Sequence, residues 1–307
     1  MYASLLSICM LGVVTTTPIE VKFAQVSPAP VEAELVARST NQRRAVILIQ
    51  GLAIHPFSGG NADKANWQGW QSPTSAIVAT LGKDSDVFAL SYSQNCALAE
   101  IADSPELTAN IASLKSAGYR EIVLVGHSAG GVIARQFVED HPESGVTKVI
   151  QVCSPNGGSS WGKAECGVCD RQELFLGSLT REARELCLTQ RDCKKIPANV
   201  EFVCLVGHYE LKLDLSYSFA VWKGHTVTIA ANKQFRGDGI VSSERQWTPD
   251  LQQQGIPAVV LPVNHIRAMR NSAAIEKIAE LVREKQPRLS PAEVVAAKQA
   301  ILGDESQ

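Results

Sequence analysis

The chain has 307 residues, of which 45% are hydrophobic and 20% are charged, a composition typical of a globular protein with a substantial core. Its formal net charge is −2 and it has no basic patch or run, which excludes nucleic acid as an expected partner. The length suits a single α/β domain that carries an insertion.

Residues 1–40 are expected to form a signal segment or an N-terminal arm and linker. Ala3–Val14 is mostly apolar, has the length of the apolar part of a signal peptide, and is too short to span a bilayer, although no Lys or Arg precedes it. We therefore expect an exported protein, secreted or periplasmic, and the alternative is a cytoplasmic protein with a loosely docked arm. Ser27–Pro30 predicts an extended linker before the folded domain, which we place at residues 41–290.

Strand-like and helix-like segments alternate through this domain. Short apolar runs typical of buried strands lie at Ala45–Ile49, Val87–Tyr92, Glu121–Val125, Lys148–Val152, Glu201–Val206 and Ala258–Leu261. Helices are expected at Ser72–Leu81 with Ser72 as N-cap, from Ser104 to Gly118, at about Val132–Asp140 and at Ser272–Lys285, followed by a tail at 291–307. The alternation predicts an α/β fold with a mostly parallel central sheet flanked by helices, whose reactive groups gather at the carboxyl ends of the strands.

A candidate nucleophile lies in the third of these strand-to-helix transitions. Gly126, Ser128 and Gly130 form a Gly-x-Ser-x-Gly sequence between a buried strand and a helix, with Gly131 following. A sharp turn there strains the backbone of Ser128 and lifts its hydroxyl clear of the sheet, and glycines on either side prevent clashes. The helix N-terminus favours negative charge that develops nearby. We therefore predict Ser128 as the nucleophile, with His127 pointing away from the site.

An attacked ester carbonyl becomes an oxyanion, which needs two N–H donors at about 3 Å. The N–H of Ala129, at the helix start, is the first candidate. The second is expected in the loop that follows the strand Ala45–Ile49, where Gly51 lets the chain turn and expose an N–H. Leu52 is favoured there over Ala53.

Two stretches interrupt the alternation, at about 156–198 and about 208–236. Asn156–Ser160 is expected to be a flexible lead into the first stretch, which we interpret as a lid. This stretch holds four of the chain's 8 cysteines, namely Cys166, Cys169, Cys187 and Cys193. Disulfides are favoured for them because they fit an exported protein, and zinc ligation and free thiols are the alternatives. Apolar residues of the same stretch are expected either to line an acyl pocket or to form the core of the lid: Trp161, Leu174, Phe175 and Leu176.

A serine hydroxyl is a weak nucleophile until a base removes its proton, and the base needs an acid to orient it. His265 is the candidate base, since it alone among the 6 histidines follows the last predicted strand. Asp238, between Gly237 and Gly239, is the candidate acid, and Glu210 is its rival because it follows the strand Glu201–Val206. The chain order Ser128, Asp238, His265 agrees with that of the α/β-hydrolases.

The segments Gly126–Gly131 and Gly237–Val241 resemble motifs of the α/β-hydrolase superfamily, and most closely those of lipases and esterases of the bacterial triacylglycerol-lipase and PGAP-like deacylase type. The resemblance covers roughly residues 45–285. It implies an eight-stranded sheet or a variant of it, a lid over the pocket, and hydrolysis of carboxylic esters without a cofactor; no metal is expected. One departure is that many such lipases carry His-Gly before the oxyanion residue, where this chain has Gln50-Gly51.

The sequence thus predicts a serine hydrolase that cleaves carboxylic esters through an acyl-enzyme on Ser128. The resemblance implies a lipid or other apolar acyl ester as the partner, with transient contact at a lipid surface. A thioesterase or an acyltransferase with the same triad is the alternative, as is a non-catalytic ligand-binding receptor on the same fold. The sequence does not define the oligomeric state or the acyl-chain length.

Overall fold

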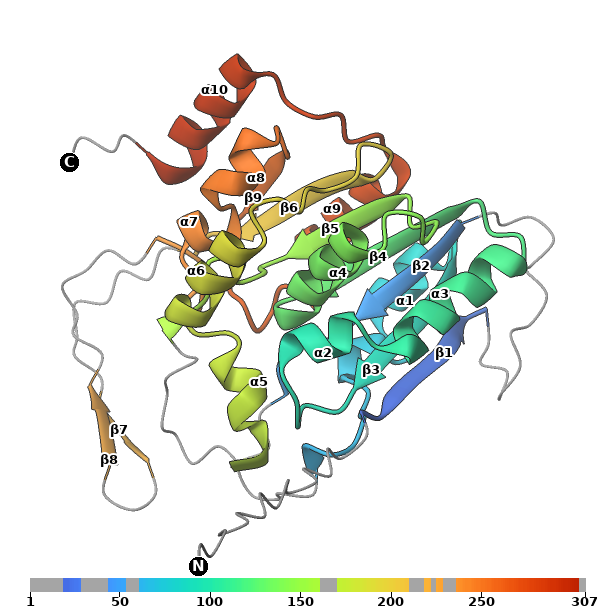
Figure 1. Cartoon of the computed structure of the whole chain (residues 1–307), viewed down its shortest axis with the longest axis horizontal. Coiled ribbons are helices and arrows are strands. Elements are labelled where there is room, and N and C mark those ends of the chain that lie inside the picture. The colour runs from blue at the N-terminus through green and yellow to red at the C-terminus, as the bar shows by residue number, and fades with distance from the viewer. Residues whose placement is uncertain are drawn as a thin grey trace, which may run out of the picture.

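The computed structural model describes residues 19–28, 44–53, 61–160, 170–209, 218–221, 225–228 and 236–303. A seven-stranded sheet with the order β1-β3-β2-β4-β5-β6-β9 forms the centre of the molecule (Figure 1). All neighbouring strands pair in parallel except β1 and β3, which are antiparallel. The strands are β1 Val21–Ser27, β2 Arg44–Ile49, β3 Asp86–Tyr92, β4 Glu121–His127, β5 Lys148–Val152, β6 Glu201–Gly207 and β9 Ala258–Leu261.

Alternate side chains of each central strand enter two separate cores, as the two-residue repeat of a strand requires. On one face, Ile47 and Ile49 of β2 pack in a cluster with α2 Leu98–Ala102, α3 Pro105–Ser116 and α4 Ala129–Asp140. Residues of α8 Pro249–Gln253 and α10 Pro291–Leu302 join the same cluster. On the other face, Val46 and Leu48 pack with α1 Ala76–Leu81 and α9 Ser272–Arg283. Burial of both strand faces explains why the strands read as continuous apolar runs.

All six predicted strands are present, but three expectations at the element ends are wrong. Val21–Ser27 is not part of a linker, because it pairs with β3 at the edge of the sheet over most of its length. The cap of α1 is Ser75 rather than Ser72, since its hydroxyl accepts the N–H of Val78. Residues 291–302 are not a tail but form α10, which begins at a capping box between Ser290 and Glu293.

Beyond Ser160, the first insertion is described again from residue 170, as a short turn at Asp170–Gln172, α5 Glu173–Gly177 and α6 Arg181–Gln190. Cys187 and Cys193 have free thiols, while Cys166, Cys169 and Trp161 lie outside the described residues, so the disulfides and the Cys-rich lid are not confirmed. The contacts of Asn156 do not fit the flexible lead that was expected at Asn156–Ser160. Asn156 is fully buried and donates to Gln151 and to the backbone of Gln246.

The second insertion contains a separate two-stranded antiparallel hairpin of β7 Ser218–Val221 and β8 His225–Thr228. After it, the described chain resumes at Arg236 and continues into α7 Ser243–Gln246. Among the helices that the structure describes, none combines the length and hydropathy needed to cross a membrane.

Candidate active site

Ser128 lies at the turn between β4 and α4 in a strained backbone conformation, with φ 54° and ψ −125°. The glycines of the turn are required by close packing. A Cβ on Gly126 would lie 2.5 Å from the carbonyl oxygen of Gly130, and a Cβ on Gly130 would lie 2.6 Å from the carbonyl oxygen of Ile49. The N–H of Ser128 donates to the carbonyl of Val152 on the adjacent strand, which anchors the turn to the sheet. The strained turn predicted from the sequence is therefore present.

The structure brings the three predicted residues together from three distant segments. Nε2 of His265 lies 2.9 Å from Oγ of Ser128, and Nδ1 of His265 lies 2.7 Å from Oδ2 of Asp238. His265 follows β9, and its own N–H donates to the carbonyl of Asp238 at 2.9 Å. Because a carboxylate only accepts, Nδ1 carries the ring proton and Nε2 is free to accept the proton of Ser128.

The carboxylate of Asp238 is fully buried and held at both oxygens. Oδ1 accepts the backbone N–H groups of Ile240 at 2.9 Å and Val241 at 2.7 Å, while Oδ2 faces His265. These bonds satisfy a buried charge that would otherwise be costly. Its rival, Glu210, lies outside the described residues.

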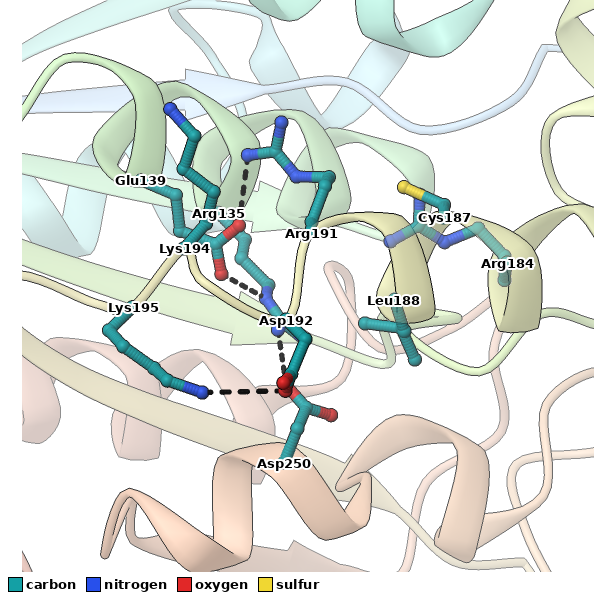
Figure 2. Close-up of a pocket in the computed structure, with 10 residues that line it drawn as sticks. All are labelled: Arg135, Glu139, Arg184, Cys187, Leu188, Arg191, Asp192, Lys194, Lys195 and Asp250. Atoms are coloured by element: carbon teal, nitrogen blue, oxygen red, sulfur yellow. Dashed lines mark hydrogen bonds and ion pairs between the residues drawn. The ribbon is translucent and has the colours of Figure 1, made fainter.

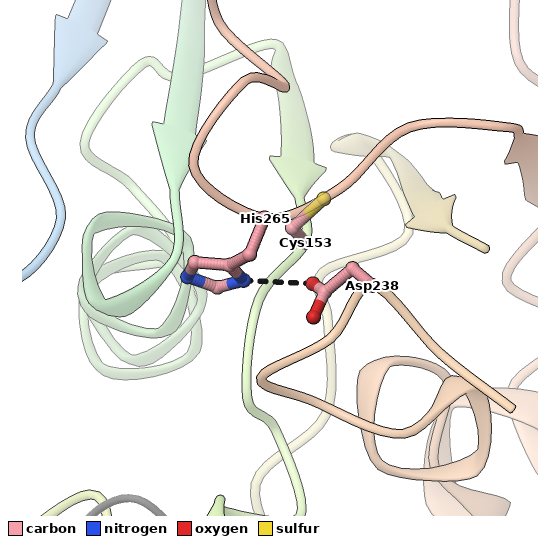
Figure 3. Close-up of side chains that lie close together, drawn as sticks. All are labelled: Cys153, Asp238 and His265. Atoms are coloured by element: carbon pink, nitrogen blue, oxygen red, sulfur yellow. Dashed lines mark hydrogen bonds and ion pairs between the residues drawn. The ribbon is translucent and has the colours of Figure 1, made fainter. Parts of the chain in front are cut away.

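Cys153 is a further buried group beside this pair (Figure 3). It follows β5 with φ 54°, and its Sγ and the ligand atoms of Asp238 and His265 lie within 4.8 Å of one another. Burial and the neighbouring Asp238 carboxylate raise the pKa of the Cys153 thiol well above its ordinary value. The thiol therefore stays protonated. With Nδ1 of His265 also protonated toward Asp238, this trio suits a hydrogen-bonded network better than a metal site.

His127 was expected to point away from the site, and this is wrong. Its Nε2 lies 2.9 Å from the backbone oxygen of His265, and the two ring centroids are 5.0 Å apart. A carbonyl only accepts, so Nε2 carries the proton. Burial and the neighbouring His265 lower the pKa of His127 to about 3, which keeps this ring neutral.

The loop after β2 passes directly over the nucleophile. A Cβ on Gly51 would lie 2.7 Å from Cβ of Ser128, so only glycine permits this approach. The N–H of Ala53 donates to Oε1 of Gln94 at 3.0 Å and is therefore already used. The two favoured oxyanion donors, Leu52 and Ala129, thus flank Ser128 from the loop and from the start of α4.

A separate cluster of charges gathers around Arg135 and Glu139 of α4 (Figure 2). Arg135 contacts Glu139 through Nε at 2.8 Å and forms an ion pair with Asp250 of α8. Arg191, just after α6, reaches the other oxygen of Glu139 at 3.0 Å. The cluster therefore ties the helix behind the nucleophile to the insertion and to α8.

This sheet, with its strained serine turn between β4 and α4, defines the α/β-hydrolase fold, and the chain has that fold. No protein-family model matches the chain, and no curated protein matches it in sequence. Solved structures of a lipase and a phospholipase share the architecture. The mature form of lipase BlEst2 from Bacillus licheniformis is similar at 13% identity and a TM-score of 0.55, over 87% of this chain and 98% of that one.

The same lipase in its propeptide form matches with a TM-score of 0.59 and 14% identity, covering 88% of this chain and 55% of the other. Phospholipase PlaB from Legionella pneumophila matches with a TM-score of 0.51 and 15% identity, over 85% of this chain and 63% of that chain. Identities this low show a shared fold, and chemistry has to be argued from the site itself.

Proposed function

We propose that the protein is a serine hydrolase that cleaves carboxylic esters. The observation that carries the proposal is the continuous hydrogen-bonded path from Oγ of Ser128 through His265 to Asp238, with distances of 2.9 Å and 2.7 Å. A serine hydroxyl in this arrangement can lose its proton to the imidazole at the moment it attacks a carbonyl.

The reaction has two steps. Oγ of Ser128 attacks the ester carbonyl while Nε2 of His265 takes the hydroxyl proton, and the N–H groups of Leu52 and Ala129 bind the oxyanion. His265 then gives the proton to the leaving alcohol, and an ester on Ser128 remains. Water, deprotonated by His265, attacks this acyl-enzyme. His265 then returns the proton to Oγ of Ser128, and the carboxylic acid is released.

A fluorophosphonate probe tests the nucleophile. We expect the probe to label the wild-type protein at Ser128, to leave Ser128→Ala unlabelled, and to react far more slowly with His265→Ala. A scaffold that only binds ligands would leave the wild-type protein unlabelled, and that result would overturn the proposal. Hydrolysis of p-nitrophenyl esters then distinguishes an esterase from an acyltransferase, which requires an added alcohol acceptor for rapid turnover.

Apolar acyl esters are the substrate class that the surroundings of Ser128 favour. Three large apolar side chains are exposed next to residues of the site: Ile266 at 75%, Leu174 at 62% and Trp67 at 42%. Ile266 follows His265. Leu174 and Trp67 lie near the loop after β2, since Gln172 contacts Ala53 and Gln68 contacts Gly51. Exposed apolar side chains mark a binding surface where they form one contiguous patch, and the proposal requires this of these three residues.

A series of p-nitrophenyl esters from acetyl to palmitoyl tests this preference. We expect kcat/KM to rise with chain length, and Ile266→Ser to lower it for long chains by several-fold while leaving the acetyl ester unaffected. Activity confined to the acetyl and butyryl esters would refute the apolar substrate and leave an esterase for small acyl groups.

A further inference from the structure

Gln94 is a buried glutamine that bridges two backbone groups of the loop after β2. Its Nε2 donates to the carbonyl of Gly51 at 3.0 Å, and its Oε1 accepts the N–H of Ala53 at 3.0 Å. The side-chain orientation follows from these partners, because a carbonyl only accepts and a backbone N–H only donates. Only 2% of Gln94 is exposed, so both bonds form out of contact with water.

These bonds fix the peptide that carries the favoured oxyanion donor. The carbonyl of Gly51 and the N–H of Leu52 belong to one planar trans peptide, in which the two groups point in opposite directions. Gln94 holds the carbonyl end, and Nε2 of Gln68 approaches the same oxygen at 3.3 Å. The N–H of Leu52 is thereby directed away from Gln94.

Gln172 extends the same network into the first insertion. This residue is fully buried, and its Nε2 donates to the carbonyl of Ala53 at 2.6 Å and to Oε1 of Gln94 at 3.1 Å. Three residues later, the ring of Phe175 in α5 packs against that of Tyr92, with the ring centroids 6.0 Å apart. The hydroxyl of Tyr92 in turn donates to the carbonyl of Gln50 at 2.7 Å. The insertion therefore contacts the loop directly at Ala53, and it is linked to Gln50 through Tyr92.

We propose that Gln94 is a positioning residue that aligns the Leu52 N–H with the oxyanion, and that Gln172 couples α5 to this alignment. The proposal rests on the proposed function, since an oxyanion forms only if Ser128 attacks an acyl group. A buried, fully paired network selects one loop conformation because every alternative leaves polar groups unsatisfied. Oxyanion donors act only when they are aligned before the reaction. The network also takes the place of the His-Gly sequence that many lipases carry before the oxyanion residue.

Gln94→Met and Gln71→Met form a matched pair for the test. Gln71 is equally buried, but its Nε2 donates to the strand carbonyls of Leu48 and Leu90, both at 2.9 Å, and its Oε1 accepts the N–H of Gln68, so it reaches the loop only through Gln68. We expect Gln94→Met to lower kcat by about 10- to 100-fold with KM changed less than about threefold, below the loss for a deleted donor. Gln71→Met should lose comparable thermal stability while keeping kcat within about threefold of the wild type.

Two further variants separate positioning from general damage. Gln94→Glu keeps the acceptor for the N–H of Ala53 but removes the donor to the carbonyl of Gly51, so this variant should also have a lower kcat than the wild type. Gln172→Met should lower kcat by about three- to tenfold, less than Gln94→Met, because Gln94 still holds Gly51. For each variant, affinity for an alkylboronic acid, which mimics the tetrahedral intermediate, should weaken by the same factor as kcat. Affinity for the fatty-acid product should stay unchanged.

The two proposals fail in different ways. If the fluorophosphonate probe does not label the wild-type protein, the proposed function is wrong. If the probe labels it, and both Gln94→Met and Gln94→Glu turn over at the wild-type kcat, the function stands and the positioning role is wrong. Should the Gln94 variants not fold, Gln172→Met decides, because unchanged kcat and boronate affinity in that variant overturn the coupling to α5.

Discussion

Nε2 of His127 donates to the backbone carbonyl of His265 at 2.9 Å, so the residue before Ser128 holds the backbone of the proposed base. Because the strained turn lifts Ser128 above the sheet, its predecessor is left beside the segment that follows β9. The contact joins two segments 138 residues apart in the chain. It also places a titratable ring in the core, which makes stability depend on pH.

His127 should destabilise the fold as the pH falls. Burial and His265 lower its pKa from 6.5 to about 3 in the folded state, so between these values the unfolded chain binds a proton that the folded chain does not. Unfolding is then favoured at lower pH, by at most about 1.4 kcal/mol per pH unit. The free energies of unfolding of the wild type and His127→Gln, measured with urea and plotted against pH, should diverge below pH 6.5 and run parallel above it. Parallel curves down to pH 4 would contradict the assignment.

Asp238→Asn should lower kcat by about 10³- to 10⁴-fold while leaving the fold intact. Oδ1 accepts two backbone N–H groups, from Ile240 and Val241, so the asparagine must place its oxygen there and its NH2 toward His265. That donor turns Nδ1 into the acceptor and puts the ring proton on Nε2, which can then no longer accept from Ser128. Steady-state kinetics measure the loss, and thermal unfolding controls for folding. A variant with more than a tenth of wild-type kcat would show that Asp238 is not the orienting acid.

The buried thiols should resist alkylation in the native protein. Burial raises the pKa of Cys96 and Cys204 to about 12 and that of Cys153 well above its ordinary value, whereas Cys193 is exposed. Since the thiolate is the reactive form, iodoacetamide at pH 8 should modify Cys193 and spare the other three until the chain is unfolded. Peptide mass spectrometry locates the adducts, and Cys193→Ser is the control. Alkylation of native Cys153 would show that this thiol is accessible and ionised.

Arg135→Met should destabilise the protein by about 3–5 kcal/mol, because it leaves the buried Glu139 carboxylate with one fewer cation and frees Asp250. The half-exposed pair of Lys277 and Glu280 is a control of similar sequence spacing, and Lys277→Met should cost only about 0–1 kcal/mol. Urea unfolding at pH 7 measures both. Equal effects in the two variants would show that the cluster on α4 is no more important than a surface ion pair.

Most of the sheet was predictable because its strands are buried on both faces. A strand such as Ala45–Ile49 has only apolar side chains, and its short length, its β-branched residues and the following Gly51 favour a strand over a helix. β1 was missed because Val21–Ser27 mixes polar and apolar residues, as a half-buried edge strand does. α10 was missed because its apolar residues lack a clear helical stripe, although Ser290, Pro291 and Glu293 already form a helix-start signal.

In the site, sequence reasoning succeeded where chemistry and local backbone requirements coincide. Ser128 needs glycines at fixed spacing, and His265 needs a place after the last strand, so both leave a pattern along the chain. Gln94 and Gln172 leave none. Each is an ordinary loop glutamine whose partners lie 41 to 119 residues away, and only the packing of α5 over the loop brings them together. The orientation of His127 likewise depends on where the segment after β9 packs in the folded chain.

The last described helix has a practical bearing on how the enzyme is handled. The carbonyl of Leu302, at the end of α10, accepts a hydrogen bond from the guanidinium of Arg236, two positions before Asp238, and Gly303 lies against the same guanidinium. An affinity tag or surface tether attached close behind this helix therefore adds bulk beside the turn that supports the acid. A difference in turnover rate between protein tagged at this end and tag-free protein would then include the effect of strain transmitted through Arg236.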